Sequence, residues 1–411
     1  MLLRDLKNKN ILILGYGVEG QSTMRFLKHV LSRQCTVDIA DQKNGPDYLE
    51  KQKNYDLVIR SPGIPKSLVT RPSTTATNIF FANTKGITVG ITGSKGKSTT
   101  ASLLHAFLHA GGLPVRLVGN IGNPMLDALI ERNTPEDIFV CELSSYQLDD
   151  IEYSPHISLI LNFFPEHMDY HGGVRNYWDA KKRITAKAAG KDYFVYNPEY
   201  SKLTELARRT KARAVPFIAE MPFPEEDIPL IGVHNRGNIR AAATVALLFN
   251  ISYSAMSDAL KKFKPLPHRL ESVGIFNGIA FYDDAISTTP ESAIAAIRSL
   301  PNIGTIFLGG KDRGYDFSAL AREIITAHIE NIVLFPESGV KIKEALEKTK
   351  EKIPNILETL SMKEAVHFAY ERTNQGAVCL LSSASPSYSL WKNFEEKGND
   401  FQNCVRMFSQ K

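Results

Sequence analysis

Short apolar runs, each followed by a polar or glycine-rich turn, open the chain and predict a small α/β domain. The expected strands cover residues 11–14, 36–40 and 56–60. A helical pattern follows the first of them to about residue 31. Residues 72–78 are rich in Pro, Ser and Thr, which is typical of a linker, so the first domain is expected to end near residue 85.

Two further series of strand and helix patterns follow. In the second series, strands are expected at residues 87–91, 138–142 and 157–162, and helices from residue 98, over 176–189 and over 238–249. In the third series, strands are expected at 279–282, 305–309, 332–335 and 377–382, and a helix over 290–299. Residues 264–267, Lys-Pro-Leu-Pro, form a stiff connector between the two series. The alternation predicts three α/β domains, over residues 1–85, 86–266 and 267–411.

The glycine-rich turn after the strand at 87–91 predicts a polyphosphate-binding loop. The expected nucleotide contacts are Gly93, Ser94, Lys95, Gly96, Lys97, Ser98 and Thr99. Backbone N–H groups at such a turn point at phosphates, Lys97 would reach the β- and γ-phosphates, and the Ser98 hydroxyl would bind Mg²⁺. The strict pattern has glycine where Ile91 stands, and a tight turn with a solvated lysine is the alternative. The loop predicts an ATP-binding protein.

A second phosphate-binding pattern lies in the first domain. Residues 15–20 read Gly-Tyr-Gly-Val-Glu-Gly, and Asp41 follows about twenty residues beyond the last glycine. Alone, this pattern favours a Rossmann-type, NAD-dependent enzyme. The residues themselves support only a diphosphate bound at the helix N-terminus and a hydroxyl or base donor bound to Asp41. Two such turns on separate domains predict two phosphorylated ligands.

Composition narrows the class of protein. Hydrophobic residues make up 43% of the chain, charged residues 23%, and the net charge is +5, which are ordinary globular values with no basic stripe for nucleic acid. The four cysteines form no CxxC pair, so neither a disulfide framework nor a zinc knot is expected. The first ten residues lack the apolar run of a signal peptide, and no stretch approaches the ~18 apolar residues of a membrane span. We therefore expect a cytoplasmic protein.

Three more polar features follow predicted strands or open a predicted helix. Glu142 ends the strand at 138–142, where it could hold the Mg²⁺ of a nucleotide, and a solvated surface carboxylate is the alternative. His167 could bind metal or substrate, or could be a surface histidine. Asn235 and Asn238 suit an adenine or phosphate contact and equally suit helix caps.

Six ordered motifs carry a resemblance that covers nearly the whole chain. They are Thr-Gly-Ser-Lys-Gly-Lys-Ser-Thr-Thr, Glu-Leu-Ser-Ser-Tyr-Gln-Leu, Asn-Phe-Phe-Pro-Glu-His-Met-Asp, His-Asn-Arg-Gly-Asn, Pro-His-Arg-Leu-Glu and Leu-Ser-Ser-Ala-Ser-Pro-Ser-Tyr. This order resembles the Mur ligases of peptidoglycan synthesis, most of all the branch that joins glutamate to UDP-N-acetylmuramoyl-alanine. The resemblance implies a Rossmann-like N-terminal domain for the UDP-sugar, a central P-loop ATPase domain with a mostly parallel sheet, and a Rossmann-like α/β C-terminal domain that closes over ATP and the amino acid.

The resemblance also implies roles for particular residues. The contacts of the UDP-sugar substrate would be Val18, Asp41, Gly63, Asn120 and Ser144. The residues that grip the nucleotide, beyond the loop, would be Asn238, Arg269 and Asp284. One Mg²⁺ would be held by Ser98 and Glu142, and a second by His167 and a carbamylated Lys181, which with Lys97 form the catalytic set. Carbamylation makes an amine a carboxylate-like oxygen ligand, which a hard cation prefers. Adjacent Lys182 leaves the register open, and an unmodified surface lysine is the alternative.

The implied amino-acid pocket departs from the common pattern of the family. Its residues would be Thr288, Arg313, Ser387, Tyr388 and Phe394. Many D-glutamate ligases carry Asp-Ser-Lys-Ala-Thr-Asn, whereas residues 284–289 read Asp-Ala-Ile-Ser-Thr-Thr, so Ile286 replaces a lysine. Arg313 replaces a second lysine and can pair bidentately with a carboxylate. We expect D-glutamate as substrate, and the Ser-Thr-Thr-Pro variant keeps open a resemblance to a branch that adds L-glutamate.

The implied reaction converts the alanyl carboxylate to an acyl phosphate, which the amine of glutamate then attacks. Two rival classes stay open, an NAD-dependent oxidoreductase and a nucleotide-binding regulator without ligase activity. Folate-polyglutamate ligases share the ATPase core but do not need the glycine-rich first domain. The expected partners are small-molecule substrates only, with no nucleic acid and no membrane, and the protein is expected to be a monomer.

Overall fold

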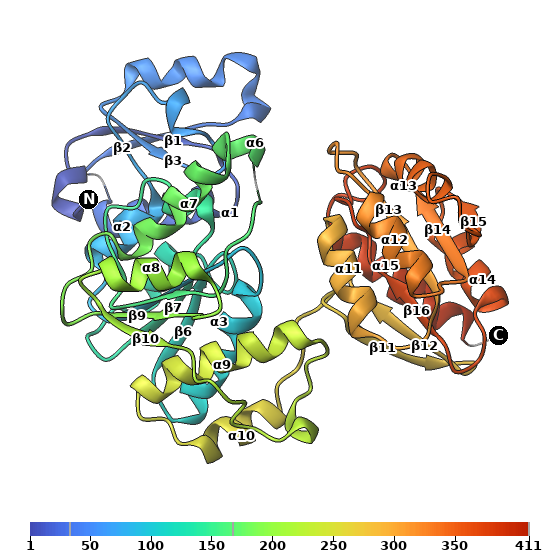
Figure 1. The fold of residues 1–411 in the computed structure, drawn as a ribbon. Helices are drawn as coiled ribbons and strands as arrows, with labels where there is room; N and C mark the ends of the chain where they lie inside the picture. Colours follow the sequence, from blue (N-terminus) through green and yellow to red (C-terminus); the bar gives the residue numbers. More distant parts are fainter. Residues whose placement is uncertain (33, 167, 410–411) are drawn as a thin grey trace. The chain divides into compact units, whose positions relative to one another are not determined.

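The computed structural model describes residues 1–32, 34–166 and 168–409, which form three sheets. The chain divides into two compact units (Figure 1). The first unit comprises residues 1–228 and 234–263, and the second comprises residues 229–233 and the chain from Lys264 onward. No helix of the described part combines the length and the apolar character that a bilayer crossing requires.

The first sheet is parallel and lies in the N-terminal part of the first unit. Its strands, in the spatial order β2-β1-β3-β4, are β1 (Asn10–Leu14), β2 (Thr36–Ala40), β3 (Leu57–Arg60) and β4 (Ser73–Thr74). The helices of this part are α1 (Val18–Leu31), α2 (Ala76–Asn83) and the 3-10 helices η1 (Leu3–Leu6), η2 (Gln42–Asn44), η3 (Pro46–Asn54) and η4 (Lys66–Leu68). The expected strands 11–14, 36–40 and 56–60 are therefore present, with ends that differ by one residue at most.

The prediction of a linker at residues 72–78 was wrong. This segment contains β4 and the start of α2, whose Ile79 and Phe80 are fully buried. Thr75 caps α2, because its side chain accepts a hydrogen bond from the backbone N–H of Asn78. A run of small polar residues is typical of linkers and of capped helix starts, and here the apolar residues that follow decide for the helix.

The second sheet is also fully parallel, in the order β10-β9-β8-β5-β7-β6. Its strands are β5 (Ile87–Thr92), β6 (Val115–Gly119), β7 (Ile138–Glu142), β8 (Ile157–Ile160), β9 (Tyr193–Tyr196) and β10 (Arg213–Pro216). Its helices are α3 (Lys97–Ala110), α4 (Met125–Glu131), α5 (Ser145–Leu148), α6 (Met168–His171), α7 (Val174–Lys182), η5 (Arg183–Thr185), α8 (Ser201–Arg209), η6 (Glu225–Asp227), α9 (Val233–Leu248) and α10 (Tyr253–Lys261). One hydrophobic cluster joins the first two sheets, with Phe80 packed edge-on against Phe139.

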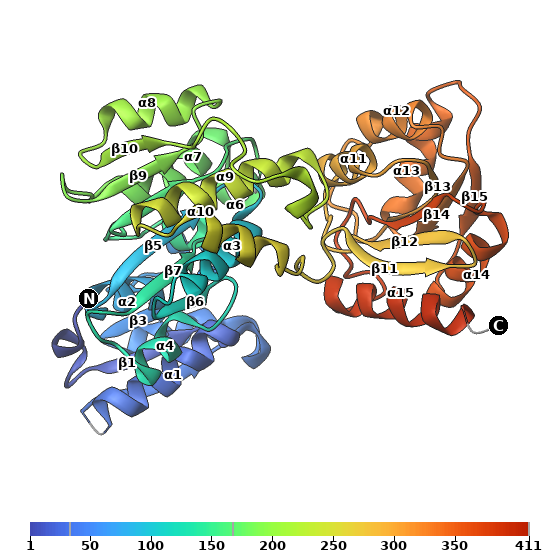
Figure 2. The ribbon, with the colours of Figure 1, turned by 90° about the horizontal axis from the view of Figure 1, so that it is seen from below.

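The third sheet is mixed and forms the second unit, in the order β11-β12-β16-β13-β14-β15. Its strands are β11 (Glu271–Phe276), β12 (Ile279–Asp283), β13 (Ile303–Gly309), β14 (Asn331–Phe335), β15 (Asn355–Glu358) and β16 (Val378–Leu381). Its helices are α11 (Pro290–Ser299), α12 (Ser318–Thr326), α13 (Ser338–Glu347), α14 (Met362–Arg372) and α15 (Phe394–Phe408). Helices α11 to α13 cover one face and α14 with α15 the other, each over its own apolar cluster (Figure 2).

Only β11 is antiparallel in this sheet, and the sequence analysis did not predict it. It pairs with β12 through Asn277 and Gly278, which both have positive φ, as a tight hairpin turn requires. The expected α/β class, with parallel sheets in the first two parts, is confirmed. The domain boundaries at residues 85 and 266 stay a prediction.

Candidate active site

The glycine-rich loop after β5 has the geometry of a strand-to-helix turn. Gly96 precedes α3 and has φ of +85°, which favours glycine. A Cβ on Gly96 would lie 2.2 Å from Oδ1 of Asn238, so α9 abuts the loop. Asn238 in turn donates from Nδ2 to Oδ1 of Asn235 at 2.8 Å. Because α9 begins at Val233, the alternative of a helix cap does not hold for Asn238.

The side chain of Asn162, just beyond β8, holds this loop in place. Its Oδ1 accepts from the backbone N–H of Lys95 at 2.9 Å, and its Nδ2 donates to the Lys95 carbonyl at 3.1 Å. The Ser94 hydroxyl donates to the carbonyl of Phe164 at 2.8 Å. The sequence analysis gave Asn162 no role, although an amide at the end of a predicted buried strand was the available signal.

Two lysines converge on one backbone carbonyl of the loop. Lys97 Nζ donates to the carbonyl of Gly93 at 3.1 Å and to that of Ser94 at 3.0 Å. Lys181 Nζ, from α7, donates to the same Gly93 carbonyl at 2.7 Å and lies 4.7 Å from the ring centroid of Tyr177. Burial, with the nearby charge of Lys97, holds the pKa of Lys181 well below its usual range.

Burial distinguishes Lys181 from its neighbour Lys182. Lys181 is 1% exposed, so the alternative of a surface lysine does not hold for it. Lys182 is partly exposed and forms an ion pair with Asp179 one helical turn away, at 2.6 Å. Only Lys181 therefore faces the loop. His167 lies outside the described residues.

Glu142 is buried at the carboxyl end of β7, directly beside β5. It is 1% exposed, which excludes the alternative of a solvated surface carboxylate. Its Oε1 accepts from Nδ2 of Asn120 at 3.4 Å, whereas Oε2 has no hydrogen-bond partner among the described residues. A buried, unpaired carboxylate oxygen is costly, and a hard cation such as Mg²⁺ would satisfy it. Ser98, at the second position of α3, supplies the hydroxyl of the same loop.

Three of the predicted UDP-sugar contacts, Val18, Asp41 and Gly63, lie at the carboxyl edge of the first sheet, whereas Asn120 and Ser144 follow β6 and β7 of the second sheet. Val18 is 72% exposed at the start of α1, and Gly63 is exposed in the turn that follows β3. Asp41 follows β2 and accepts from the backbone N–H of Tyr16 at 2.7 Å and of Lys43 at 3.1 Å. These two bonds, the Tyr16 bond first, lower the pKa of Asp41. Its carboxylate thus stays charged and braces the glycine-rich turn.

A buried ion pair joins the two sheets of the first unit next to these residues. Arg60 Nη2 lies 2.7 Å from Oδ2 of Asp150, and the Arg60 side chain has no exposed surface. Burial raises the pKa of Glu19 to about 7, against the opposing attraction of Arg60. Ser144 caps α5 nearby through a hydrogen bond with the backbone N–H of Gln147. The sequence analysis missed Arg60, because its burial depends on contacts across the two sheets.

In the second unit, Asp284 is buried at the end of β12. Its carboxylate accepts from the backbone N–H of Leu270 at 3.2 Å, from Ser382 Oγ at 3.0 Å and from Ser287 Oγ. Burial raises the pKa of Asp284 to about 7, although these hydrogen bonds and Arg269 oppose it. Asp284 can therefore change its protonation state near neutral pH.

A second polar cluster lies beside Asp284. His268 Nδ1 bonds Oδ2 of Asp283 at 2.7 Å, and Gln402 Nε2 donates to the same oxygen at 2.9 Å and to Glu271 at 3.0 Å. A Cβ on Gly398 would lie 2.1 Å from His268 Nδ1, so α15 approaches this cluster closely. The protein groups thus satisfy one another.

The predicted amino-acid contacts occupy three segments of the second unit. Ser387 is 2% exposed, and its Oγ has no hydrogen-bond partner among the described residues. Arg313 and Tyr388 are exposed, and Thr288 lies just before the capping residue of α11. Phe394 begins α15 and packs edge-on against His268. Ile286, which stands where many D-glutamate ligases have lysine, is half-buried.

Comparisons with known proteins agree with this arrangement. A profile of the Mur ligase middle domain matches residues 91–223, and one of the Mur ligase glutamate ligase domain matches residues 268–385. The UDP-N-acetylmuramoylalanine–D-glutamate ligase of Streptococcus agalactiae serotype III is 32% identical over 445 aligned positions, with 97% of each chain covered. The enzyme of that name from Thermoanaerobacter sp. strain X514 is 31% identical over 450 positions, with 98% of this chain and 99% of that one covered. The chain belongs to the Mur ligase family.

Solved structures of Mur ligases share the fold of this chain. The UDP-N-acetylmuramate-alanine ligase of Thermotoga maritima has a TM-score of 0.64 at 17% identity, covering 98% of this chain and all of that one. The MurF ligase of Thermotoga maritima, solved in complex with ADP, has a TM-score of 0.63 at 15% identity, covering 98% and 97%. At such identities the likeness concerns the fold alone.

Membership of the Mur ligase family decides between the function classes left open by the sequence. The chain is an ATP-dependent ligase that forms amide bonds, in peptidoglycan precursor synthesis. The pattern at residues 15–20 therefore does not mark an NAD-dependent oxidoreductase.

Proposed function

We propose that this Mur ligase joins glutamate, D-glutamate in the first place, to UDP-N-acetylmuramoyl-L-alanine. The observation that carries the proposal is the near full-length identity of about one third with ligases of that name. The UDP-sugar would contact Val18, Asp41, Gly63, Asn120 and Ser144, which flank the exits of β1, β2, β3, β6 and β7. The enzyme would work as a cytoplasmic monomer on small molecules only, without nucleic acid or membrane.

The phosphate loop would bind ATP and activate its terminal phosphoryl group. Loop N–H groups and Lys97 offset the negative charge that moves during transfer. Asn238 supports the loop, and Arg269 and Asp284 would contact the nucleotide from the second unit. The alanyl carboxylate accepts the γ-phosphoryl group and becomes an acyl phosphate, with ADP as the leaving group. The glutamate amine then attacks the acyl carbon, and inorganic phosphate leaves as the amide forms.

Two Mg²⁺ ions would bind next to the loop. Ser98 and the unpaired oxygen of Glu142 would hold one, and His167 with a carbamylated Lys181 would hold the other. Bound Mg²⁺ would neutralise charge on the phosphates. The lowered pKa of Lys181 supports carbamylation, because only the neutral amine adds carbon dioxide. Its burial supports Lys181 over Lys182 as the modified residue.

The amino-acid site would use Thr288, Arg313, Ser387, Tyr388 and Phe394. Ser387 offers a buried hydroxyl without a partner in the described chain, and Arg313 offers an exposed guanidinium for a carboxylate. The L-glutamate alternative keeps one supporting observation, namely Ile286 in place of a lysine.

The decisive experiment supplies ATP, Mg²⁺, UDP-N-acetylmuramoyl-L-alanine and one glutamate enantiomer at a time, and follows phosphate release and product mass. We expect phosphate release that depends on D-glutamate and a product heavier by one glutamyl residue. Turnover with L-glutamate alone would establish the alternative. Phosphate release that no glutamate enantiomer stimulates would overturn the proposal.

The paired lysines of α7 give a matched test of the carbamate. Lys181→Ala is expected to lower kcat by about two orders of magnitude or more, because it removes a ligand next to the transferred group. Lys182→Ala should stay within about twofold of the wild type, since its ion pair is partly exposed. Short carboxylic acids such as propionate should restore part of the activity of Lys181→Ala. Equal losses in both variants would contradict the assignment.

A further inference from the structure

A fully buried lysine that the proposed reaction does not use lies in the second unit. Lys397, on α15, has no exposed surface. Its Nζ donates to the carbonyl of Gly309 at 2.8 Å and lies 4.9 Å from the ring centroids of both Phe335 and Trp391. Burial lowers the pKa of Lys397 to about 7, although Asp283 opposes the shift. Lysine is rarely buried in full unless it is paired, so this contact requires an explanation.

Gly309, which Lys397 contacts, belongs to a corner where three segments meet. Its N–H donates to the carbonyl of Ser383 at 2.8 Å, which ties β13 to the segment after β16. The carbonyl of Gly310 accepts from the N–H of Ser338 at 2.8 Å, at the start of α13. The N–H of Lys311 donates to the carbonyl of Pro386 at 2.6 Å. Lys397 Nζ adds a side-chain donor from α15, at the Gly309 carbonyl.

The corner is also sterically tight. A Cβ on Gly309 would lie 2.1 Å from the carbonyl oxygen of Phe335, and one on Gly310 would lie 2.2 Å from that of Pro386. Backbone therefore touches backbone here, and no side chain cushions a displacement. Arg313 follows the corner by three residues, and Ser387 directly follows Pro386. A shift of the corner would move both proposed amino-acid contacts.

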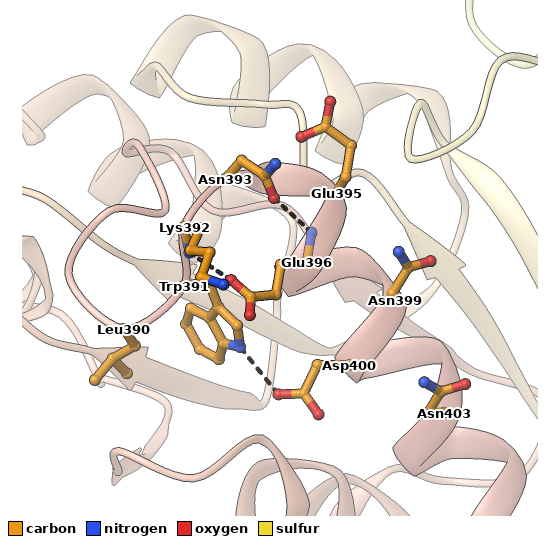
Figure 3. Close-up of a pocket in the computed structure, with 9 residues that line it drawn as sticks. All are labelled: Leu390, Trp391, Lys392, Asn393, Glu395, Glu396, Asn399, Asp400 and Asn403. Carbon is orange, nitrogen blue, oxygen red and sulfur yellow. Dashed lines mark hydrogen bonds between the residues drawn. The ribbon is translucent and has the colours of Figure 1, made fainter.

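Hydrogen bonds fasten residues 391–393 to the first turns of α15 (Figure 3). Trp391 Nε1 donates to Asp400 at 2.9 Å, and the N–H of Lys392 donates to Glu396 at 2.6 Å. Asn393 caps the helix by accepting from the N–H of Glu396 at 2.8 Å. These residues line an open, polar depression (Figure 3). Trp391 therefore cannot move away from Lys397 without breaking these bonds.

We propose that Lys397 is a positioning residue for the amino-acid substrate. Its amine holds the Gly309 corner against α15 and so fixes the segment of Arg313 relative to the segment of Ser387. The inference rests on the proposed function, since it assigns the glutamate carboxylates to those segments. An amine donates an N–H whether it is charged or neutral, so the bond to Gly309 persists on either side of neutral pH.

The test compares the Michaelis constants of the three substrates in variants of the full chain. Lys397→Met keeps the length of the side chain and removes the donor. We expect its KM for glutamate to rise by about tenfold, because one buried hydrogen bond is lost, with the KM for ATP within about twofold of wild type. Lys397→Arg retains donors and is expected to recover most of the lost affinity for glutamate. Lys392→Met, an exposed lysine of the same segment, is the matched control and should behave as wild type.

The possible outcomes separate the two proposals. A wild-type chain that turns over with glutamate, combined with an unchanged KM for glutamate in Lys397→Met, would overturn the positioning role alone. An equal rise of all three Michaelis constants would also overturn it, because a merely structural lysine predicts that result. A Lys397→Arg variant as weak as Lys397→Met would overturn the donor requirement. A wild-type chain inactive with both enantiomers would overturn both proposals.

Discussion

The buried amine of Lys397 is expected to make the stability of the folded protein increase with pH. In an unfolded chain a lysine titrates near pH 10.4, whereas burial lowers the pKa of Lys397 to about 7 in the folded protein. Between these values the unfolded state binds one more proton, so wild-type stability rises with pH across this window and falls as pH drops towards 7. The proton linkage costs roughly 4 to 5 kcal/mol at and below pH 7 and is nearly gone at pH 10.

Replacing Lys397 with Met removes this cost and creates another. The carbonyl of Gly309 loses the amine that donates to it, which costs roughly 1 to 3 kcal/mol when the acceptor stays buried. At pH 7 the variant should therefore be more stable than wild type by roughly 1 to 3 kcal/mol. The difference should shrink by about 1 kcal/mol for each pH unit and vanish or reverse near pH 10.

Urea unfolding of both proteins from pH 6.5 to 10 measures this difference directly. Lys392→Met should differ from wild type by a constant of less than about 0.5 kcal/mol over the same range, because its side chain is exposed. Parallel curves for wild type and Lys397→Met would refute the reasoning, since they would mean that Lys397 titrates alike in the folded and unfolded states. A variant that is more stable yet binds glutamate more weakly would link this buried amine to function.

Two further predictions concern the phosphate loop. Gly96→Ala should lower the free energy of unfolding by roughly 1 to 3 kcal/mol and weaken ATP binding, because φ of Gly96 is +85° and the new Cβ would meet Asn238. Urea unfolding measures the first effect, and titration calorimetry with ATP measures the second. A variant with wild-type affinity for ATP would contradict the prediction that close packing of Gly96 against Asn238 shapes the loop. Asn162→Ala removes both hydrogen bonds to Lys95 and should raise the KM for ATP by about tenfold, with an unchanged KM for glutamate. A rise of both Michaelis constants would instead mean that the substitution disturbs the structure of the whole active site.

The sequence predicted most strands and both glycine-rich turns from strand to helix, because these features are local. Apolar runs that end at glycine-rich turns follow from backbone geometry and from the hydrophobic effect alone. The prediction of a linker at residues 72–78 failed because a linker and a capped helix start have the same composition there. Strand β11 was missed because it lies at the edge of the sheet, with mixed burial and no continuous apolar run.

The sequence indicated which charged residues belong to the candidate site, but not which of them are buried. Glu142 and Lys181 are buried, whereas Lys182, one residue away from Lys181, is partly exposed. Nothing local distinguishes the two lysines, because the difference depends on which face of α7 meets the loop after β5. Arg60 and Lys397 went unnoticed for the same reason, since each is buried by segments distant in sequence.

The loop concentrates positive charge in a way that accounts for both of its proposed ligands. Lys97 and Lys181 donate to the same carbonyl of Gly93, so two ammonium groups there would repel each other in a poorly solvated environment. The lowered pKa of Lys181 is one resolution, because the neutral amine keeps its hydrogen bond without the second charge. A triphosphate beside Lys97 and a carbamate on Lys181 would also relieve the repulsion, because each brings negative charge to the site. Loss of the Lys181 amine should therefore weaken anion binding at the site less than loss of Lys97, because the lowered pKa of Lys181 reduces the positive charge that it contributes.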